Sequence, residues 1–478
     1  MEIIYQFGRI SGLRLNVSKS QAVWLGSKTG SNETICDDLN ILWTNDTFKV
    51  LGIVFTNNLK GMVDLNYKEK ILSTKRLLGS WVQRDLTPIG KITILKSLAL
   101  PKFIHLFSSL PNPSKAIISE LDKIFFRFIW NNKPDKIKRS TIIGSYEKGG
   151  LNMVHIPSFI SYIKIKWIKR IYNNPKGSWQ KLLSYIFDIR EDTEGVWGLN
   201  KHKLLELRKI ISNEFWKDVI SAIMLLKKDN LTTSEFLQED IRNFCNISEY
   251  SFYTKWCLQG INCVNDLINQ HGNFKQFEEI QNISGCNNFL KYYQIIEKIP
   301  MDWKKRIKEF KVNNSLLDVC EDDELLIKLI SNKCIKFVYE ILRNKVFQSP
   351  DTRIMKWKHE LGNMNEEYNH YYLFPKKCSS DTSLIYFQYR ILNRILSTNT
   401  FLFRLNISET NLCTFCAVEE ETLTHLFYDC VHVRNLWNEI HQWLAELLKY
   451  FLMNRSFGPV LVLNQPVRKN FNWSDFFF

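Results

Sequence analysis

Three cysteines and one histidine lie within a short segment near the end of the 478-residue chain, and their spacing constrains the local fold more than any other feature. Cys413, Cys416, His425 and Cys430 have the pattern C-x2-C-x8-H-x4-C. Three thiolates and one imidazole are the ligand set of a closed tetrahedral zinc site, which leaves no coordination position for catalysis. We therefore expect a structural zinc ion that holds together a segment too small for its own core.

The residues around this motif allow more than one reading. Residues 422–427 can place His425 on a short helix, and four further residues bring Cys430 back to the same side. Glu419–Glu421 are expected to form a solvated turn between the two halves. His432 is an alternative fourth ligand, and a chance cluster around a core histidine is the alternative to a metal site. Trp437 and Trp443 lie on a following predicted helix that can pack the segment onto the rest of the chain.

The other eight cysteines are scattered singly, which indicates reduced thiols rather than a disulfide framework. The N-terminus has no secretory pattern, and no run of 18 uncharged apolar residues occurs. We therefore expect a protein of the nucleus, the cytoplasm or both, which is not secreted and has no membrane partner.

Positive charge is concentrated in one stretch of the chain. The formal net charge is +15, whereas residues 51–181 alone carry +16 and residues 182–478 carry −1. A hydrophobic content of 45% with 19 glycines and 12 prolines excludes a disordered or collagen-like chain. This local excess of positive charge favours a surface that binds phosphate groups. The alternative is charge that only keeps the protein soluble.

The hydrophobic pattern predicts a mainly α fold after a short β-rich start. Gln21–Leu25 and Lys49–Phe55 are rich in strand-forming residues. Thr87-Pro88 predicts a helix start, with the helix continuing to Leu100 and ending at Pro101. Apolar residues recur at helical steps from 117 to 129, and Gly149-Gly150-Leu151 predicts a turn before another helix.

Common catalytic motifs are missing from the sequence. It contains no P-loop, no G-x-G-x-x-G, no H-E-x-x-H and no G-x-S-x-G. Asp37-Asp38 lacks the strand-forming flanks of a polymerase hairpin and reads as a turn or helix start. Glu321–Glu324 reads as the acidic first turn of a helix, with a metal cluster as the alternative.

Four stretches, in order, resemble the reverse transcriptases of non-LTR (LINE-type) retrotransposons. Residues 11–20, SGLRLNVSKS, are similar to the S-G-L-x-[IL]-N-x-x-K-[ST] segment that follows their catalytic hairpin. Residues 48–53, FKVLGI, resemble the primer-grip pattern F-x-Y-L-G-[IV], with Val50 in place of the usual Tyr. The third stretch resembles the thumb (residues 100–102, 111, 128–130 and 149–151), and the fourth resembles the zinc-binding domain (residues 390–398 with the Cys/His motif).

The resemblance covers about residues 5–180 and 375–445, and it implies a mainly α chain with a β-hairpin remnant of a polymerase palm. The implied domains are a palm remnant at 1–57, a basic helical thumb at 58–181, a helical connector at 182–375, a zinc-binding knuckle at 376–445 and a tail at 446–478.

The family is an RNA-directed DNA polymerase whose [FY]-x-D-D motif stands a few dozen residues before the equivalent of Gly12. The sequence begins at Met1, after the expected position of this motif, so we expect a fragment that has no catalytic residues and is inactive alone. Mg²⁺ is expected only if the palm is present. By resemblance, Lys19 lies near the leaving pyrophosphate. Two alternatives remain, an active reverse transcriptase whose palm comes from an upstream segment and a non-enzymatic zinc-knuckle module that binds a protein.

The expected partner is RNA or an RNA–DNA hybrid, bound through residues 51–181 without sequence readout. Trp167 can stack on an unpaired base, or it can be buried. The oligomeric state stays open. The candidate phosphate-contacting residues are Lys19, Lys123, Arg127, Lys133, Lys136, Lys138, Arg139, Lys164, Lys166, Lys169 and Arg170.

Overall fold

The computed structural model forms two compact units, each assembled from separate parts of the sequence. It describes residues 2–24, 26–35, 41–44, 47–56, 59–173, 199–227, 233–246, 249–285, 288–313, 321–332, 335–349, 351–361 and 369–453. The predicted turn at Asp37-Asp38 lies outside these residues. The first unit comprises Met1–Trp81, Lys96–Phe125 and His155–Lys345, and the second comprises Val82–Leu95, Phe126–Val154 and Val346–Phe478.

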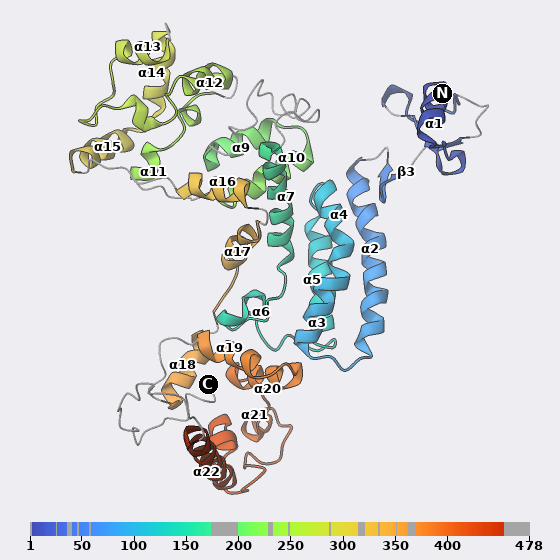
Figure 1. Cartoon of the computed structure of the whole chain (residues 1–478), viewed down its shortest axis with the longest axis vertical. Helices are drawn as coiled ribbons and strands as arrows, with labels where there is room; N and C mark the ends of the chain where they lie inside the picture. Colours follow the sequence, from blue (N-terminus) through green and yellow to red (C-terminus); the bar gives the residue numbers. More distant parts are fainter. Residues whose placement is uncertain are drawn as a thin grey trace. The chain divides into compact units, whose positions relative to one another are not determined.

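The structure is mainly helical with few strands, as predicted (Figure 1). No helix in the described part of the chain combines the length and the apolar character needed to cross a membrane. The predicted thumb stretch, residues 58–181, contributes segments to both units.

The strands of the first unit form two small pairs. β1 (Gln21–Ala22) pairs in parallel with β2 (Leu42–Trp43), and β3 (Thr47–Val50) pairs antiparallel with β4 (Ile53–Thr56). The strand-rich run at Lys49–Phe55 therefore forms a hairpin, as the resemblance of residues 48–53 implied. Leu51 and Gly52 have φ angles of 49° and 84°, the pair of positive values that a two-residue type I′ turn requires.

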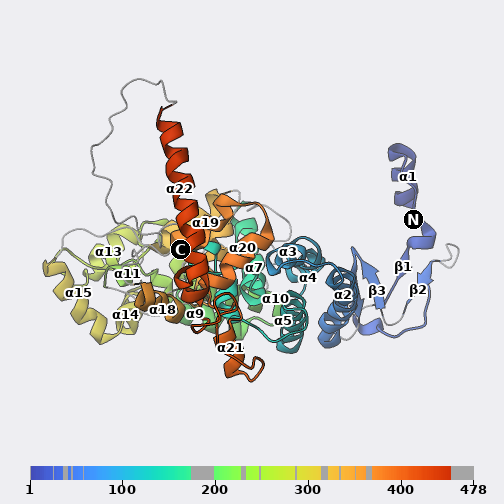
Figure 2. The ribbon, with the colours of Figure 1, turned by 90° about the horizontal axis from the view of Figure 1, so that it is seen from below.

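Three helices of the first unit pack side by side. They are α2 (Leu59–Val82), α4 (Pro101–Ser109) and α5 (Lys115–Ile129) (Figures 1 and 2). The fully buried Tyr67 on α2 lies between Phe103 and Phe107 of α4, with ring centroids 6.3 and 5.8 Å away. Aromatic packing of this kind adds to the area that the three rings bury. It fixes α2 against α4.

The predicted helix from Thr87 to Leu100 forms, with a change of winding that the sequence did not indicate. Thr87 caps α3 (Pro88–Ile94), since its hydroxyl accepts a hydrogen bond from the Gly90 N–H at 3.3 Å. A π-helical segment, Leu95–Ala99, follows. Pro101 does not end the helical path but begins α4, because the first position of a helix needs no N–H donor.

The rest of the first unit is a helical array around a large apolar core. α7 (Ile156–Asn173) contacts α4, α10 (Glu214–Met224), α16 (Glu321–Ser331) and α17 (Lys336–Asn344). α16 begins at Glu321, as the acidic first turn predicts. The remaining elements are α1 (Glu2–Ser11), α9 (Lys201–Ile210), α11 (Thr233–Leu237), α12 (Tyr250–Leu258), α13 (Phe277–Ser284), α14 (Phe289–Lys298), α15 (Met301–Asn313) and the short helices Val17–Lys19, Gly26–Lys28, Ile241–Phe244 and Val264–Leu267.

The second unit joins segments about 200 residues apart in the sequence. Its helices are α3, α6 (Arg139–Ile143), α18 (Asp351–Leu361), α19 (Asn369–Cys378), α20 (Thr382–Leu392), α21 (Asn399–Arg404) and α22 (Val431–Met453), with short turns at Tyr146–Lys148 and His425–Asp429. The Thr141 hydroxyl donates to the Gln348 carbonyl at 2.9 Å, and the buried Tyr389 hydroxyl donates to the Gly149 carbonyl at 3.1 Å. These bonds tie residues 126–154 to the C-terminal part of the unit.

The predicted turn at Gly149-Gly150-Leu151 is confirmed and requires both glycines. Gly149 has a φ angle of 76°, in the left-handed region. A Cβ atom at Gly150 would lie 2.1 Å from the Gly144 carbonyl oxygen, closer than any side chain can approach. The turn therefore requires a left-handed backbone conformation at Gly149 and a residue without a Cβ atom at Gly150.

Candidate metal centre

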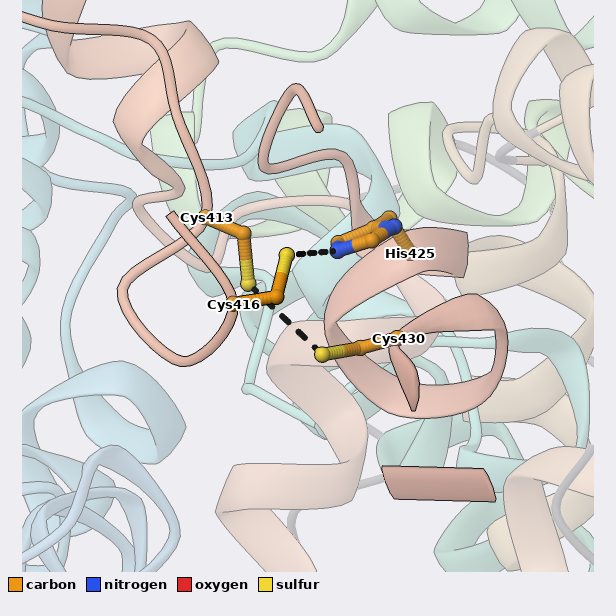
Figure 3. A group of neighbouring side chains, drawn as sticks. All are labelled: Cys413, Cys416, His425 and Cys430. Atoms are coloured by element: carbon orange, nitrogen blue, oxygen red, sulfur yellow. Dashed lines mark hydrogen bonds between the residues drawn. The ribbon is translucent and has the colours of Figure 1, made fainter. Parts of the chain in front are cut away.

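The four residues of the Cys/His motif converge on one point of the second unit (Figure 3). Their ligand atoms all lie within 4.8 Å of one another. The Cys413 and Cys430 sulfurs are 4.0 Å apart, and the Cys416 sulfur is 3.3 Å from His425 Nε2. Tetrahedral zinc, with bonds of about 2.3 Å to sulfur and about 2.0 Å to nitrogen, separates its ligand atoms by about 3.5–3.8 Å. The donor set and its geometry fit zinc.

A tight turn directs the first two sulfurs to the same side. The Ala417 N–H donates to the Cys413 carbonyl at 2.9 Å, and Ala417 has a φ angle of 54°. The Cys413 N–H donates to the Glu419 carbonyl at 2.8 Å, which closes the base of the turn. The C-x2-C spacing thus forms the loop that two ligands to one metal require.

His425 and Cys430 come from a single helical turn, as the sequence predicted, although the turn is π-helical. It spans His425–Asp429, and the Cys430 N–H donates to the His425 carbonyl at 2.9 Å. At its start the His425 N–H donates to the Thr422 hydroxyl at 3.1 Å. The wider winding of five residues brings Cys430 back to the side of His425.

Burial and hydrogen bonding act differently on the thiols. Burial raises the pKa of Cys413, which is 2% exposed. The backbone N–H groups of Glu419 and Val418 lower the pKa of Cys416 to about 6. Cys416 therefore supplies a thiolate at neutral pH, and the metal charge favours loss of the remaining thiol protons.

A carboxylate lies close to the far nitrogen of the histidine. Glu419 Oε2 is 2.9 Å from His425 Nδ1, without the alignment of a hydrogen bond, while Nε2 faces the Cys416 sulfur. The ring therefore presents Nε2 to the other ligand atoms. Glu419 and Glu420 are exposed, as expected for a solvated turn.

The prediction that Glu421 shares this solvated turn was wrong. Its side chain is only 4% exposed and accepts hydrogen bonds from Thr414 and Asn399. A run of three acidic residues predicts side chains exposed to solvent. Glu421 instead points into the protein, where backbone and side-chain donors compensate its carboxylate for the lost hydration. His432 is exposed and lies outside the cluster that the described residues form.

The two tryptophans after the motif behave differently. The Trp437 Nε1–H donates to the Phe427 carbonyl at 2.9 Å and so joins α22 to the π-helical turn. Trp443 is 59% exposed, so the helix contacts the metal segment through Trp437. On a helix, positions six residues apart point in different directions, and only one of the two faces the metal segment.

A small apolar cluster supports the metal segment from α18 and α20. Trp357, Ile391 and Leu423 are buried together. The Trp357 Nε1–H donates to the Leu392 carbonyl at 3.0 Å. Arg394 lies 4.3 Å above the Trp357 ring and forms two hydrogen bonds with Glu360, at 2.6 and 2.9 Å. Sequence reasoning missed Trp357 and Glu360, because spacing along the chain gives no signal for a contact across this distance.

The predicted phosphate-contacting residues are divided between the two units. Those in the first unit are Lys19, Lys123, Lys164, Lys166, Lys169 and Arg170, and those in the second unit are Arg127, Lys133, Lys136, Lys138 and Arg139. All are exposed except three. Arg139 is half-buried, pairs with Asp135 at 2.7 Å and lies 4.5 Å from the Phe126 ring centroid. Lys169 is half-buried and donates to the Asn332 carbonyl.

Lys164 is the third exception, and its predicted contact with phosphate was wrong. It is fully buried, and its ammonium group donates to the Leu110 carbonyl at 2.5 Å and lies 3.9 Å from the centre of the Phe215 ring. Burial lowers its pKa, while Asp218 acts in the opposite direction. The burial of Lys164 was not predicted because the sequence of α7 is rich in lysine. Lys164 nevertheless lies on the apolar side of this helix.

Trp167 is part of the core rather than a stacking platform. Its ring packs edge-on against Phe215 and Trp216, at 5.5 and 5.9 Å between centroids. Its Nε1–H donates to the Ser108 carbonyl at 3.0 Å. Of the two readings of this residue, burial is the one that the structure supports.

Residues 356–437 match the sequence model of a family described as zinc-binding in reverse transcriptase. The matched segment includes Trp357, the four ligand residues and Trp437, and so covers the support as well as the cluster. The chain is thus related to reverse transcriptases through a zinc-binding region of this family.

Proposed function

We propose that the chain belongs to a non-LTR (LINE-type) reverse-transcriptase protein and binds RNA or RNA–DNA hybrid without reading sequence. The matched zinc-binding region supports the relation to reverse transcriptases. The order of the resembling segments supports the non-LTR type. The hairpin β3–β4 lies at the segment that resembles the primer grip.

The observation that carries the nucleic-acid part is the exposure of most cations in the basic stretch. Lys133, Lys136 and Lys138 lie on the loop between α5 and α6, and Lys166 and Arg170 lie on the exposed side of α7. Exposed cations of this kind contact phosphate oxygens and release counterions, so they add affinity without specificity.

A salt titration tests this proposal. Affinity for a fluorescent RNA and for an RNA–DNA hybrid is measured between 50 and 200 mM salt (about the range over which phosphate-dominated binding changes steeply). The double variant Lys136→Ala/Lys138→Ala should reduce the slope of log K against log salt by about 1.4–1.8. The matched control is Lys305→Ala/Lys308→Ala on α15, outside the basic stretch, which should leave the slope unchanged. Undetectable or salt-independent binding would contradict the proposal.

The proposal assigns structural zinc to Cys413, Cys416, His425 and Cys430, and no catalytic role to any residue. It places the protein in the nucleus, the cytoplasm or both. We expect no nucleotide incorporation by this chain in a primer-extension assay with Mg²⁺. Incorporation would instead support an active polymerase.

A protein-binding role of the zinc segment is a second candidate, and exposed apolar side chains around the cluster favour it. Phe401, Ile407, Phe415 and Val418 are 51, 69, 59 and 76% exposed. Apolar groups gathered on a surface are typical of interaction sites. If Cys413→Ser abolishes zinc binding but leaves RNA affinity unchanged, this second role gains support. A parallel loss of RNA affinity would assign the zinc segment to RNA binding.

A further inference from the structure

Glu421 is a buried carboxylate that reaches two other parts of the zinc segment. Its Oε2 accepts hydrogen bonds from the Thr414 N–H at 2.8 Å and from the Thr414 hydroxyl at 2.5 Å. Its Oε1 accepts from the Asn399 N–H at 2.7 Å. These bonds lower the pKa of Glu421 against the opposing effect of burial, so the side chain is ionised at neutral pH.

Both hydrogen-bond partners of Glu421, Thr414 and Asn399, are tied to the segment that carries the ligand Cys413. Thr414 directly follows the ligand Cys413, and the next N–H, that of Phe415, faces the Cys413 sulfur at 3.4 Å. Asn399 is the first residue of α21, and its side-chain amide donates to the Leu412 carbonyl at 2.8 Å. Glu421 therefore joins the ligand turn to the start of a neighbouring helix.

We infer that Glu421 is a positioning residue for the metal, which fixes the Cys413–Cys416 turn and couples metal binding to the order of α21. The inference rests on the proposed zinc binding and is independent of RNA binding. A carboxylate only accepts hydrogen bonds, so it matches the converging donors of Thr414 and Asn399. A glutamine places an amide N–H₂ among those donors and cannot satisfy them all.

The charge of Glu421 has two opposed effects on metal binding, because a carboxylate disfavours thiolates but attracts the zinc cation. Charge alone therefore predicts little net change in affinity when Glu421 is neutralised. Loss of the hydrogen bonds that position the ligand turn predicts weaker binding and a looser α21. Changes to outer partners of metal ligands weaken affinity by about 10–100-fold.

The test measures zinc affinity of the full chain by competition with a chromophoric chelator, and amide hydrogen exchange in α21 with zinc present. Glu421→Gln should weaken zinc binding by about 10–100-fold and speed exchange in α21. The control Glu409→Gln changes an exposed carboxylate of the same segment and should match the unmodified chain. Affinity of Glu421→Gln within twofold of the unmodified chain, or tighter, would overturn the inference.

A gentler variant guards against misfolding. Thr414→Val removes one hydroxyl donor and keeps the backbone N–H, so a severalfold loss of zinc affinity is expected. Combined with Glu421→Gln it should cost less than the sum of the two single changes, because both act on one network. Strict additivity would overturn the inference. Failure of the unmodified chain to take up zinc would overturn the proposed zinc binding as well.

Discussion

Trp357 supports the metal segment from outside the ligand motif, and changing it to phenylalanine measures that support. The indole is 3% exposed and its Nε1–H bonds to the Leu392 carbonyl. Phenylalanine leaves that carbonyl without its partner, which costs about 1–2 kcal/mol, and the smaller ring leaves a space that costs about 1 kcal/mol more. We expect a total loss of about 2–3 kcal/mol in the free energy of unfolding of the second unit.

The matched control is Trp443→Phe, because Trp443 is on the same unit and is 59% exposed. Exposed substitutions usually change stability by less than about 0.5 kcal/mol. The assay follows zinc release during urea unfolding with a chromophoric chelator, which reports the second unit separately from the first. Trp357→Phe should lower the urea midpoint of zinc release, whereas Trp443→Phe should not. Equal midpoints for the two variants would refute the role assigned to the Trp357 cluster.

Three further predictions follow from single contacts. Cys430→Ser should release zinc and speed hydrogen exchange at about residues 405–435, with the exposed Cys378→Ser as control; unchanged metal stoichiometry would show that Cys430 is not a ligand. Gly150→Ala should destabilise the second unit by about 2 kcal/mol or more, because its Cβ meets the Gly144 carbonyl, whereas Gly79→Ala in α2 should be neutral or stabilising in urea unfolding. The buried Lys164 has a lowered pKa, so the unfolded chain binds more protons above neutral pH and stability should rise between about pH 7 and pH 10. Lys164→Met should remove this rise in urea midpoints, and an unchanged rise would show that another group causes it.

The parts of the structure that the sequence predicted well are those that short-range chemistry determines. Thr87-Pro88 begins a helix because the hydroxyl and the proline ring act within one turn. The stripe from Ile117 to Ile129 forms the buried side of α5, and Lys123 and Arg127 face solvent. The spacing of the Cys/His motif predicted the ligand cluster, because two ligands come from one tight turn and two come from one helical turn.

The predictions that were wrong concern residues whose surroundings come from segments distant in the sequence. Lys164 is buried because Leu110 and Asp218 approach it from other segments. Glu421 turns inward because Thr414 and Asn399 offer donors there. Local charge patterns cannot show such partners. For the same reason the pattern gave no sign that residues 126–154 join the C-terminal unit.

The packing of residues 126–154 with C-terminal segments affects folding during synthesis. Roughly 190 residues separate Val154 from Val346, where the chain returns to the second unit. At a synthesis rate of about 5–20 residues per second, residues 126–154 wait about 10–40 s for their partners. During that time Leu151, which is buried beside Tyr372 and Tyr389 in the finished unit, has no C-terminal segment to cover it. The second unit is thus exposed to aggregation during translation, and chaperone binding to the nascent chain is expected at this stretch.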